Sequence, residues 1–184
     1  VNTMRQHLEN NGYTLASTKY EDVFSTPGKR YIIFTGAESI NTKYTYTRFF
    51  NQELNKYGEY IKYIILSPAG SVGINLGAVR FLGIGAVDYN YSAIRQIMGR
   101  CNRLKSHVFL PEKDRTLINK IYLAVSNKAY IKEHKDELEQ WYTRVAPEHK
   151  EQFPSIERCI YQDSLQNDKV NEAFRKVLQD VSIV

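Results

Sequence analysis

A short apolar segment that runs directly into a glycine- and serine-rich loop constrains the fold most. Residues 61–66, Ile-Lys-Tyr-Ile-Ile-Leu, are mostly apolar and β-branched, which predicts a buried strand. The next ten residues, Ser67–Leu76, contain two glycines, two serines and one asparagine. Loops of this composition at the carboxyl end of a strand bind ligands in open α/β sheets, and their N–H groups can hold phosphate. The pattern therefore predicts an α/β fold with a ligand-binding loop.

A basic segment follows a second apolar strand at Val79–Ile84. Residues 96–103 read Gln-Ile-Met-Gly-Arg-Cys-Asn-Arg, with Arg100 and Arg103 three residues apart. In a helix, residues at i and i+3 share a face, so both guanidinium groups could reach one anion. Arginine suits phosphate because its planar fork matches the oxygens with two parallel hydrogen bonds. Gly99 removes a side chain where another backbone or a ligand must come close. The alternative is an ordinary basic helix face.

The order strand, glycine loop, strand and Gln-x-x-Gly-Arg-x-x-Arg resembles the second RecA-like lobe of superfamily 2 helicases and DNA translocases. In this resemblance Ser67–Leu76 occupies motif V and Gln96–Arg103 occupies motif VI. The nearest likeness is to the helicase-like nucleoside triphosphatases of large cytoplasmic DNA viruses. There a comparable run is followed by a Ser-His pair and a Leu-Pro-x-x-x-Arg segment, which here are Ser106-His107 and Leu110–Arg115.

The resemblance implies a fold and a domain division. It covers about residues 31–125, and it departs from the family at Val72, where an acidic residue often precedes the second glycine. We expect an α/β fold with a RecA-like, mostly parallel sheet flanked by helices. Residues 1–125 would form the second RecA-like lobe, truncated at its N-terminal side. Residues 126–184 would form a helical C-terminal extension that packs on the lobe.

The resemblance also implies roles for individual residues. The catalytic group would comprise two arginine fingers, and a glutamine that positions the γ-phosphate or the attacking water: Arg100, Arg103 and Gln96. Three residues would lie against the nucleotide, the asparagine bonding its ribose: Gly73, Asn75 and Gly99. Three would contact nucleic acid, the first at a backbone phosphate: Ser67, Gly70 and Ser71.

The expected cofactor is ATP with Mg²⁺, held mainly by a first lobe that this sequence does not contain. No G-x-x-x-x-G-K-[ST] motif occurs in the chain, and Pro27-Gly28-Lys29 lacks both the upstream glycine and the following hydroxyl. Asp136-Glu137 lies in a charged helical stretch, so we interpret it as a solvated face and expect no metal site. The resemblance implies an ATP-dependent helicase or nucleoside triphosphatase in the full-length protein and no activity in this chain alone.

The distribution of charge indicates the partners. Between Tyr60 and Pro111, Asp88 is the only acidic residue against six lysines and arginines, so this segment carries the whole formal charge of +5. A basic strip suits polyanions; the alternative is a solvated face without function. With the resemblance, the expected partners are nucleic acid (DNA rather than RNA), the N-terminal RecA-like lobe of the same protein and viral transcription machinery. No apolar run approaches the length of a membrane span.

Composition and cysteine usage bound the compartment. A hydrophobic content of 42% with 24% charged residues is typical of a globular protein rather than a disordered one. Cys101 and Cys159 are isolated, with no C-x-x-C pattern, which favours a reduced intracellular compartment. The resemblance implies the host cytoplasm or the virion of a large DNA virus.

Further elements follow from periodicity. Met4, Leu8 and Tyr13 suggest the end of an amphipathic helix that closes at residues 10–12. Residues 31–34 predict a strand. Asn41 or Thr42 could cap a helix that ends at Tyr57-Gly58 and carries apolar residues as follows: Tyr46, Phe49, Phe50 and Leu54.

The C-terminal part is expected to be mainly helical. Residues 117–125 predict a closing strand, and Asp168 could cap a final helix. The apolar stripe of that helix, which includes Val170, Phe174 and Val177, would pack on the domain itself or on a partner, and we expect the domain. Tyr89 and Tyr91 are candidates for a cleft position, and we interpret His107 as structural.

Two function classes remain open at this point. One is the second motor lobe of an ATP-dependent helicase or translocase. The other is a non-catalytic module that keeps the fold for binding nucleic acid or protein. Gln96, Arg100 and Arg103 together favour the motor, since a mere binding surface does not need this spacing.

Overall fold

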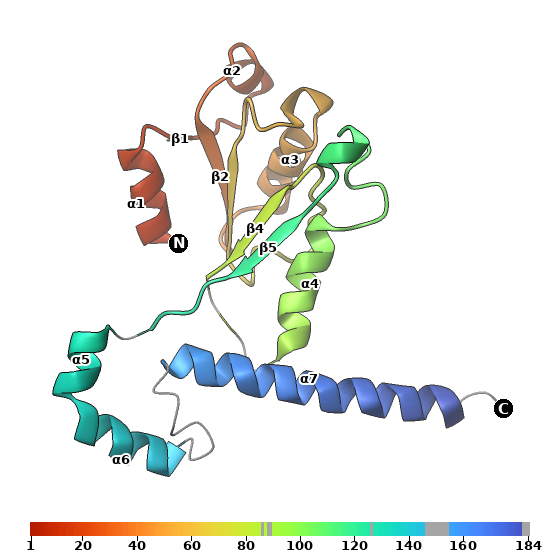
Figure 1. Cartoon of the computed structure of the whole chain (residues 1–184). Coiled ribbons are helices and arrows are strands. Elements are labelled where there is room, and N and C mark those ends of the chain that lie inside the picture. The colour runs from red at the N-terminus through yellow and green to blue at the C-terminus, as the bar shows by residue number, and fades with distance from the viewer. Residues whose placement is uncertain (86, 88–89, 126, 146–154, 182–184) are drawn as a thin grey trace. The chain divides into compact units, whose positions relative to one another are not determined.

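The computed structural model describes residues 1–85, 87, 90–125, 127–145 and 155–181 (Figure 1). The helices are α1 (Asn2–Asn10), α2 (Tyr20–Phe24), α3 (Ile40–Phe50), α4 (Tyr91–Cys101), α5 (Lys128–Glu133), α6 (Lys135–Val145) and α7 (Ile156–Val181). The strands are β1 (Thr14–Leu15), β2 (Arg30–Phe34), β3 (Tyr63–Leu66), β4 (Phe81–Ile84) and β5 (Ile118–Ile121). Short 3-10 helices cover Glu53–Asn55 and Glu112–Asp114.

The described strands form two parallel sheets. One has the order β1-β2-β3, with Leu15 beside Tyr31 and Phe34 beside Leu66 in register. In the other, β4 pairs with β5. The N–H of Ile118 donates to the carbonyl of Arg80 at 2.9 Å, and the N–H of Tyr122 donates to that of Ile84 at 2.8 Å. Both partners advance by four residues, so this pair is parallel as well.

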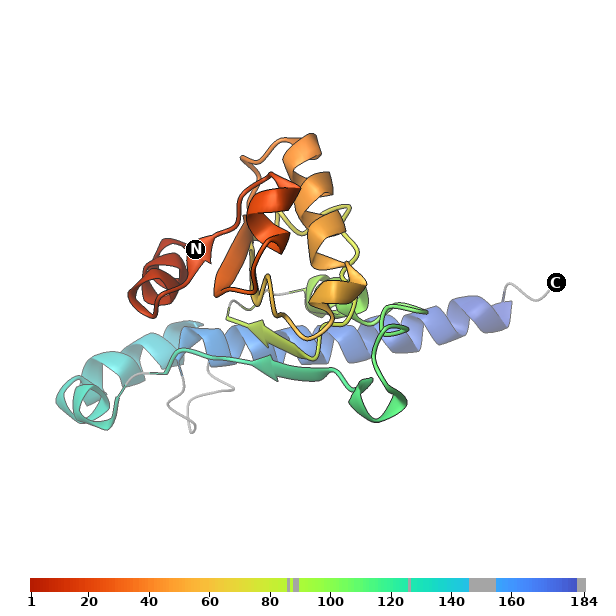
Figure 2. The ribbon, with the colours of Figure 1, turned by 90° about the horizontal axis from the view of Figure 1, so that it is seen from above.

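Side chains alternate across β2 and place helices on both of its sides. The hydroxyl of Tyr31 donates to Glu9 of α1 at 2.8 Å, whereas the ring of Phe34 lies 6.3 Å from that of Tyr46 on α3. The views in Figures 1 and 2 show α1 and α3 on opposite sides of the strand. Because Tyr31, Ile32 and Phe34 are fully buried, β2 is the centre of the core. The α/β, RecA-like fold with a helical C-terminal segment is confirmed.

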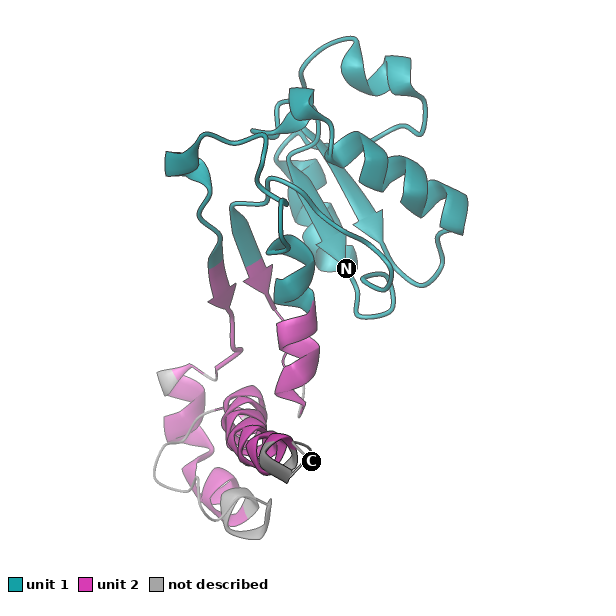
Figure 3. Ribbon diagram, turned by 90° about the vertical axis from the view of Figure 1, so that its right-hand side faces the viewer, with its two compact units in different colours: residues 1–82, 97–118 teal, residues 83–96, 119–184 magenta. Residues whose placement is uncertain are grey.

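The chain divides into two compact units, coloured in Figure 3. The first contains residues 1–82 and 97–118, and the second contains residues 83–96 and 119–184. The expected division into a lobe of residues 1–125 and an extension of residues 126–184 stays a prediction. Among the described residues, no helix is both long enough and apolar enough to cross a bilayer.

The observed bounds of α3, α4 and β5 correct the corresponding expectations. Ser39 caps α3, accepting from the N–H of Thr42 at 3.1 Å, and the helix ends at Phe50, so Leu54 lies beyond it and is exposed. Ser39 was overlooked because Asn41 and Thr42 also suit an N-cap. The helix with motif VI ends at Cys101, so Arg103 is not on its face. The predicted strand at residues 117–125 is shorter, covering Ile118–Ile121.

The last helix also differs from the expectation. It begins at Ile156 and runs through Asp168, which is therefore not a cap. Asp168 instead pairs with Arg95 at 2.7 Å. Val170, Phe174 and Val177 are more than half exposed. The packing of this stripe on the lobe stays a prediction.

Candidate functional site

The first half of the glycine loop, residues 67–71, is a compact turn at the carboxyl end of β3. The N–H of Ser67 donates to the carbonyl of Phe34 at 2.9 Å, which joins the loop to the end of β2. The Ser67 hydroxyl accepts from the N–H of Gly70 at 3.1 Å, and the Ser67 carbonyl accepts from the N–H of Ser71 at 3.0 Å. The Ser71 hydroxyl donates to the carbonyl of Pro68 at 2.7 Å. These serines therefore shape the turn.

Gly70 is required by the packing of this turn. A Cβ placed on Gly70 would lie 1.9 Å from the carbonyl oxygen of Phe34 and 2.7 Å from the nitrogen of Thr35. No side chain fits there, because the loop rests directly on the backbone that ends β2. Gly70 and Ser71 are both buried, so of the three residues expected to contact nucleic acid only Ser67 is partly accessible.

The second half of the loop is bound to Arg100 at the end of α4. The Arg100 guanidinium donates through Nη1 to the carbonyl of Ile74 at 3.2 Å. The carbonyl of Arg100 accepts from the N–H of Leu76 at 3.1 Å. The structure thus brings together the two segments that the sequence analysis assigned to motifs V and VI.

The side chain of Asn51 also bonds the second half of the loop, at Asn75 and Gly77. Its Nδ2 donates to the carbonyl of Asn75 at 2.9 Å, and its Oδ1 accepts from the N–H of Gly77 at 2.7 Å. Asn51 is not among the site residues predicted from the sequence. Its position directly after α3 could have indicated a helix C-cap, but no local pattern links it to a loop some twenty-five residues away.

The Ser106-His107 pair fixes the end of the loop. The N–H of Ala78 donates to the carbonyl of Ser106 at 2.7 Å. His107 is buried, and its Nε2 donates to the carbonyl of Val79 at 2.7 Å, while Nδ1 lies 2.7 Å from the Ser106 hydroxyl. The structural interpretation of His107 is confirmed. In the Leu110–Arg115 segment, the Nε of Arg115 donates to the carbonyl of Leu110 at 2.9 Å.

Three candidate ligand contacts remain accessible in this unit. Gly73 has a φ of +80°, which favours glycine, and Asn75 is exposed. Within the described part of the chain, the side-chain amide of Asn75 has no hydrogen bond. A Cβ placed on Gly99 would meet no described atom within 4 Å. The expected close approach at Gly99 is therefore not made by the described chain itself, and a ligand remains the alternative.

Arg103 lies in the turn after α4 and is exposed. It lines an open cavity of about 360 Å³ together with Lys105 and Arg115. The carbonyl of Arg103 accepts from the N–H of Ser106 at 2.9 Å. No described residue forms a hydrogen bond or an ion pair with the Arg103 side chain. Arg100 and Arg103 therefore differ: Arg100 braces the loop, whereas the Arg103 guanidinium is available to an anion.

Gln96 belongs to the second unit and is exposed there. In the same unit Arg95 pairs with Asp168 and with Glu172, both at 2.7 Å. The hydrogen bond from Arg95 lowers the pKa of Glu172. Arg95 also stacks over the ring of Tyr91, which in turn lies 6.2 Å from that of Tyr161, so Tyr91 is a packing residue. The expectation for Tyr89 lies outside the described residues.

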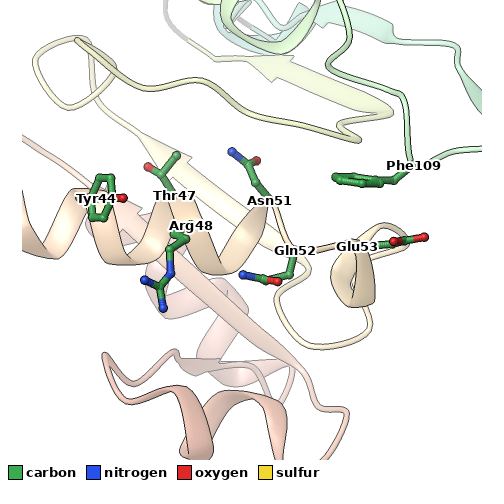
Figure 4. A pocket seen from close by; sticks show the side chains of 7 residues that line it. All are labelled: Tyr44, Thr47, Arg48, Asn51, Gln52, Glu53 and Phe109. Carbon is green, nitrogen blue, oxygen red and sulfur yellow. The ribbon is translucent and has the colours of Figure 1, made fainter.

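A second open cavity, of about 440 Å³, follows one side of α3 and the turn after it (Figure 4). It is lined by Tyr44, Thr47, Arg48, Asn51, Gln52, Glu53 and Phe109. The close view shows the amide of Asn51 and the guanidinium of Arg48 pointing in opposite directions. Asn51 reaches the glycine loop, whereas Arg48 does not.

Thiol and metal chemistry have few candidates in the described chain. Cys101 is free and buried, and burial raises the pKa of its thiol to about 11, so it is a poor nucleophile at neutral pH. Across the described ranges, no three His, Cys, Asp or Glu side chains gather in a metal-binding arrangement.

Comparison with known proteins finds viral relatives. The chain is 26% identical over 161 residues to proteins named "Termination factor NPH-I homolog" of African swine fever virus; the match covers 88% of the chain and 21% of each relative. It is 35% identical over 133 residues to the protein named "Putative helicase 087L" of Invertebrate iridescent virus 3, over 70% of the chain and 13% of that protein. The chain thus spans about a fifth or less of the length of these relatives.

Both matches extend far enough to include the site. An aligned stretch of 88% or 70% of the chain contains residues 67–103 wherever it begins. This chain is therefore similar to helicase-like viral proteins through the loop and the arginine segment. No family model matches the chain.

Proposed function

We propose that this chain is the C-terminal motor lobe of an ATP-dependent nucleic-acid helicase or translocase. The observation that carries the proposal is the direct connection of residues 74–76 to Arg100 by two hydrogen bonds. It places a glycine loop and an arginine segment at one location, with the side chains of Asn75 and Arg103 left available. The similarity to viral proteins named as a termination factor and a helicase agrees with this assignment.

Each predicted site residue has a defined task in the proposal. Arg103 stabilises negative charge on the transferring phosphoryl oxygens, which is worth roughly 10³–10⁵ in rate for an arginine finger. Arg100 has five N–H donors, so one bond to Ile74 leaves donors for a phosphate. Gly73 and Gly99 leave backbone accessible to the nucleotide, Asn75 bonds the ribose, and Gln96 positions the γ-phosphate or the attacking water.

Nucleic acid would bind at the carboxyl ends of β2 and β3. Gly70 and Ser71 shape the turn there, and Ser67 presents a hydroxyl that accepts from Gly70 and still has a proton to donate to a phosphate oxygen. The basic segment between residues 60 and 111 supplies attraction for the backbone. We propose DNA as the strand that is bound.

The proposal requires a second part of the protein. The described residues contain no P-loop and no cluster of metal ligands, so a preceding RecA-like lobe would supply the binding of Mg²⁺ and of the phosphates. Residues 1–125 would face that lobe, and residues 126–184 would form the helical extension. The name of the African swine fever virus relatives suggests work in viral transcription, with the transcription machinery as a partner.

The test is nucleic-acid-stimulated ATP hydrolysis by the full-length protein with the substitution Arg103→Ala. Because the side chain of Arg103 has no partner among the described residues, we expect an unchanged fold and an unchanged affinity for nucleotide, with kcat lower by about a thousandfold. Arg48→Ala removes an equally charged, exposed arginine from α3 and should leave kcat within a factor of about two.

Equal rates in the wild-type protein and Arg103→Ala would contradict the finger. A wild-type protein that hydrolyses no ATP but binds nucleic acid would instead identify a non-catalytic binding module.

A further inference from the structure

The side chain of Asn51 bridges the peptide groups on either side of Leu76. Both functions of its amide are used, Nδ2 on the carbonyl of Asn75 and Oδ1 on the N–H of Gly77. The N–H of Leu76 donates to Arg100, and the Leu76 side chain is buried. The backbone around Asn75 is therefore fixed from both sides, by Asn51 and by Arg100.

The chain is built so that asparagine fits at position 51. Asn51 is the C-cap of α3, and its own N–H donates to the carbonyl of Thr47, so the helix fixes the backbone from which its side chain extends. A Cβ on Gly77 would lie 3.4 Å from Oδ1 of Asn51, so glycine at 77 gives the amide room to approach. Alanine at 51 would have neither polar group, and aspartate would place a carboxylate against the Asn75 carbonyl.

Asn75 itself presents an exposed amide to solvent. With both neighbouring peptide groups fixed, the direction of its side chain from the backbone is fixed as well. We propose that Asn51 is a positioning residue, which holds Asn75 so that its amide bonds a ribose hydroxyl of the nucleoside triphosphate. This inference rests on the proposed function and adds to it a residue that lies outside both motifs.

A positioning role predicts a particular change in kinetics. The ribose does not react, so its contact is the same in the ground state and the transition state. Loss of such a contact raises KM and leaves kcat unchanged. For Asn51→Ala in the full-length protein, we expect KM for ATP to rise by about tenfold with kcat within a factor of about two.

The test compares ATP with 2′-deoxyATP and 3′-deoxyATP. In the wild-type protein, KM should rise for the nucleotide that lacks the hydroxyl bonded by Asn75. In Asn51→Ala and in Asn75→Ala this rise should disappear, because the contact is already lost, and the double variant should be no worse than either single one. Gln52→Ala, a change at the neighbouring residue of the same cavity, should behave as the wild type.

Hydrogen exchange at the amide of Gly77 tests the hydrogen bond from this amide to the Asn51 side chain. This amide should be protected in the wild type and exchange quickly in Asn51→Ala, while the amides of β2 and β3 stay protected. If Asn51→Ala does not fold, Asn75→Ala gives the same nucleotide comparison, since its side chain has no partner among the described residues.

The outcomes separate this inference from the proposed function. An active wild-type protein in which Asn51→Ala raises KM equally for all three nucleotides, or lowers kcat alone, overturns the positioning role and leaves the motor assignment intact. A wild-type protein without ATP hydrolysis overturns the proposed function and this inference with it.

Discussion

The two halves of the loop from Ser67 to Val79 are held in different ways. Residues 67–71 bond to one another and to the end of β2, so their conformation follows from local sequence and one neighbouring strand. Residues 74–79 are held by side chains and carbonyls from α3, from α4 and from the Ser106-His107 turn. Val72 and Gly73 separate the halves and are exposed. The half proposed to bind nucleotide thus depends on three separate segments, whereas the half proposed to bind nucleic acid depends on its own residues and on the end of β2.

The largest expected effect is on the first half. Gly70→Ala would place a methyl group 1.9 Å from the carbonyl oxygen of Phe34, so the loop has to leave the end of β2. We expect a loss of more than about 4 kcal/mol in the free energy of unfolding, measured by urea denaturation with circular dichroism.

Gly99→Ala is the matched control for this change. It adds the same methyl group in α4 at a place where the described chain has no atom within 4 Å. Alanine is the better helix former, so the unfolding free energy should rise by about 0.5–1 kcal/mol. Similar losses for the two variants would contradict the close contact at Gly70.

The difference between the halves also explains what sequence reasoning could predict. The strand predicted at residues 61–66 is observed as β3 at Tyr63–Leu66, half-buried or exposed rather than buried. Its existence, the loop after it and the helix with Arg100 were predictable, because each depends on local apolar patterning and on glycine. The serines of the first half were assigned to nucleic acid, and the structure shows that their hydroxyls and carbonyls also shape the turn.

The second half was less accessible to such reasoning. The hydrogen bonds of Asn51 to Asn75 and Gly77 join segments whose proximity depends on the tertiary fold. No spacing pattern in the sequence predicts them. Arg103 was expected on the helix face with Arg100. It lies beyond the helix end, because α4 stops at Cys101 and a turn follows.

A smaller effect is expected where the second half ends. His107→Ala would remove a buried side chain with both ring nitrogens bonded and would leave the carbonyl of Val79 without its donor. We expect a loss of roughly 2 kcal/mol in unfolding free energy and faster amide exchange at residues 76–79, with residues 67–71 unaffected. The exposed His7 of α1 serves as control, and His7→Ala should change the unfolding free energy by less than about 0.5 kcal/mol. Equally faster amide exchange at residues 67–71 and 76–79 in His107→Ala would contradict the independence of the two halves of the loop.

The smallest expected effect is a dependence on acid that is confined to the first half. Glu38 accepts from the hydroxyl and the N–H of Thr35, the residue that follows β2 and lies under Gly70. Burial raises the pKa of Glu38, but the hydrogen bonds from Thr35 outweigh it, and the pKa is lowered from 4.5. A lowered pKa means that the carboxylate stabilises the fold above pH 4.5 and that this contribution is lost as the pH falls through the pKa of the folded state.

Acid should therefore lower the amide protection factors, relative to the intrinsic exchange rate at each pH, at residues 67–71 before it affects residues 74–79. Glu38→Gln should remove that pH dependence. An identical response of both halves in the wild type would mean that the end of β2 does not support the first half on its own. The loop would then be a single cooperative unit, and its nucleic-acid and nucleotide contacts would have to change together.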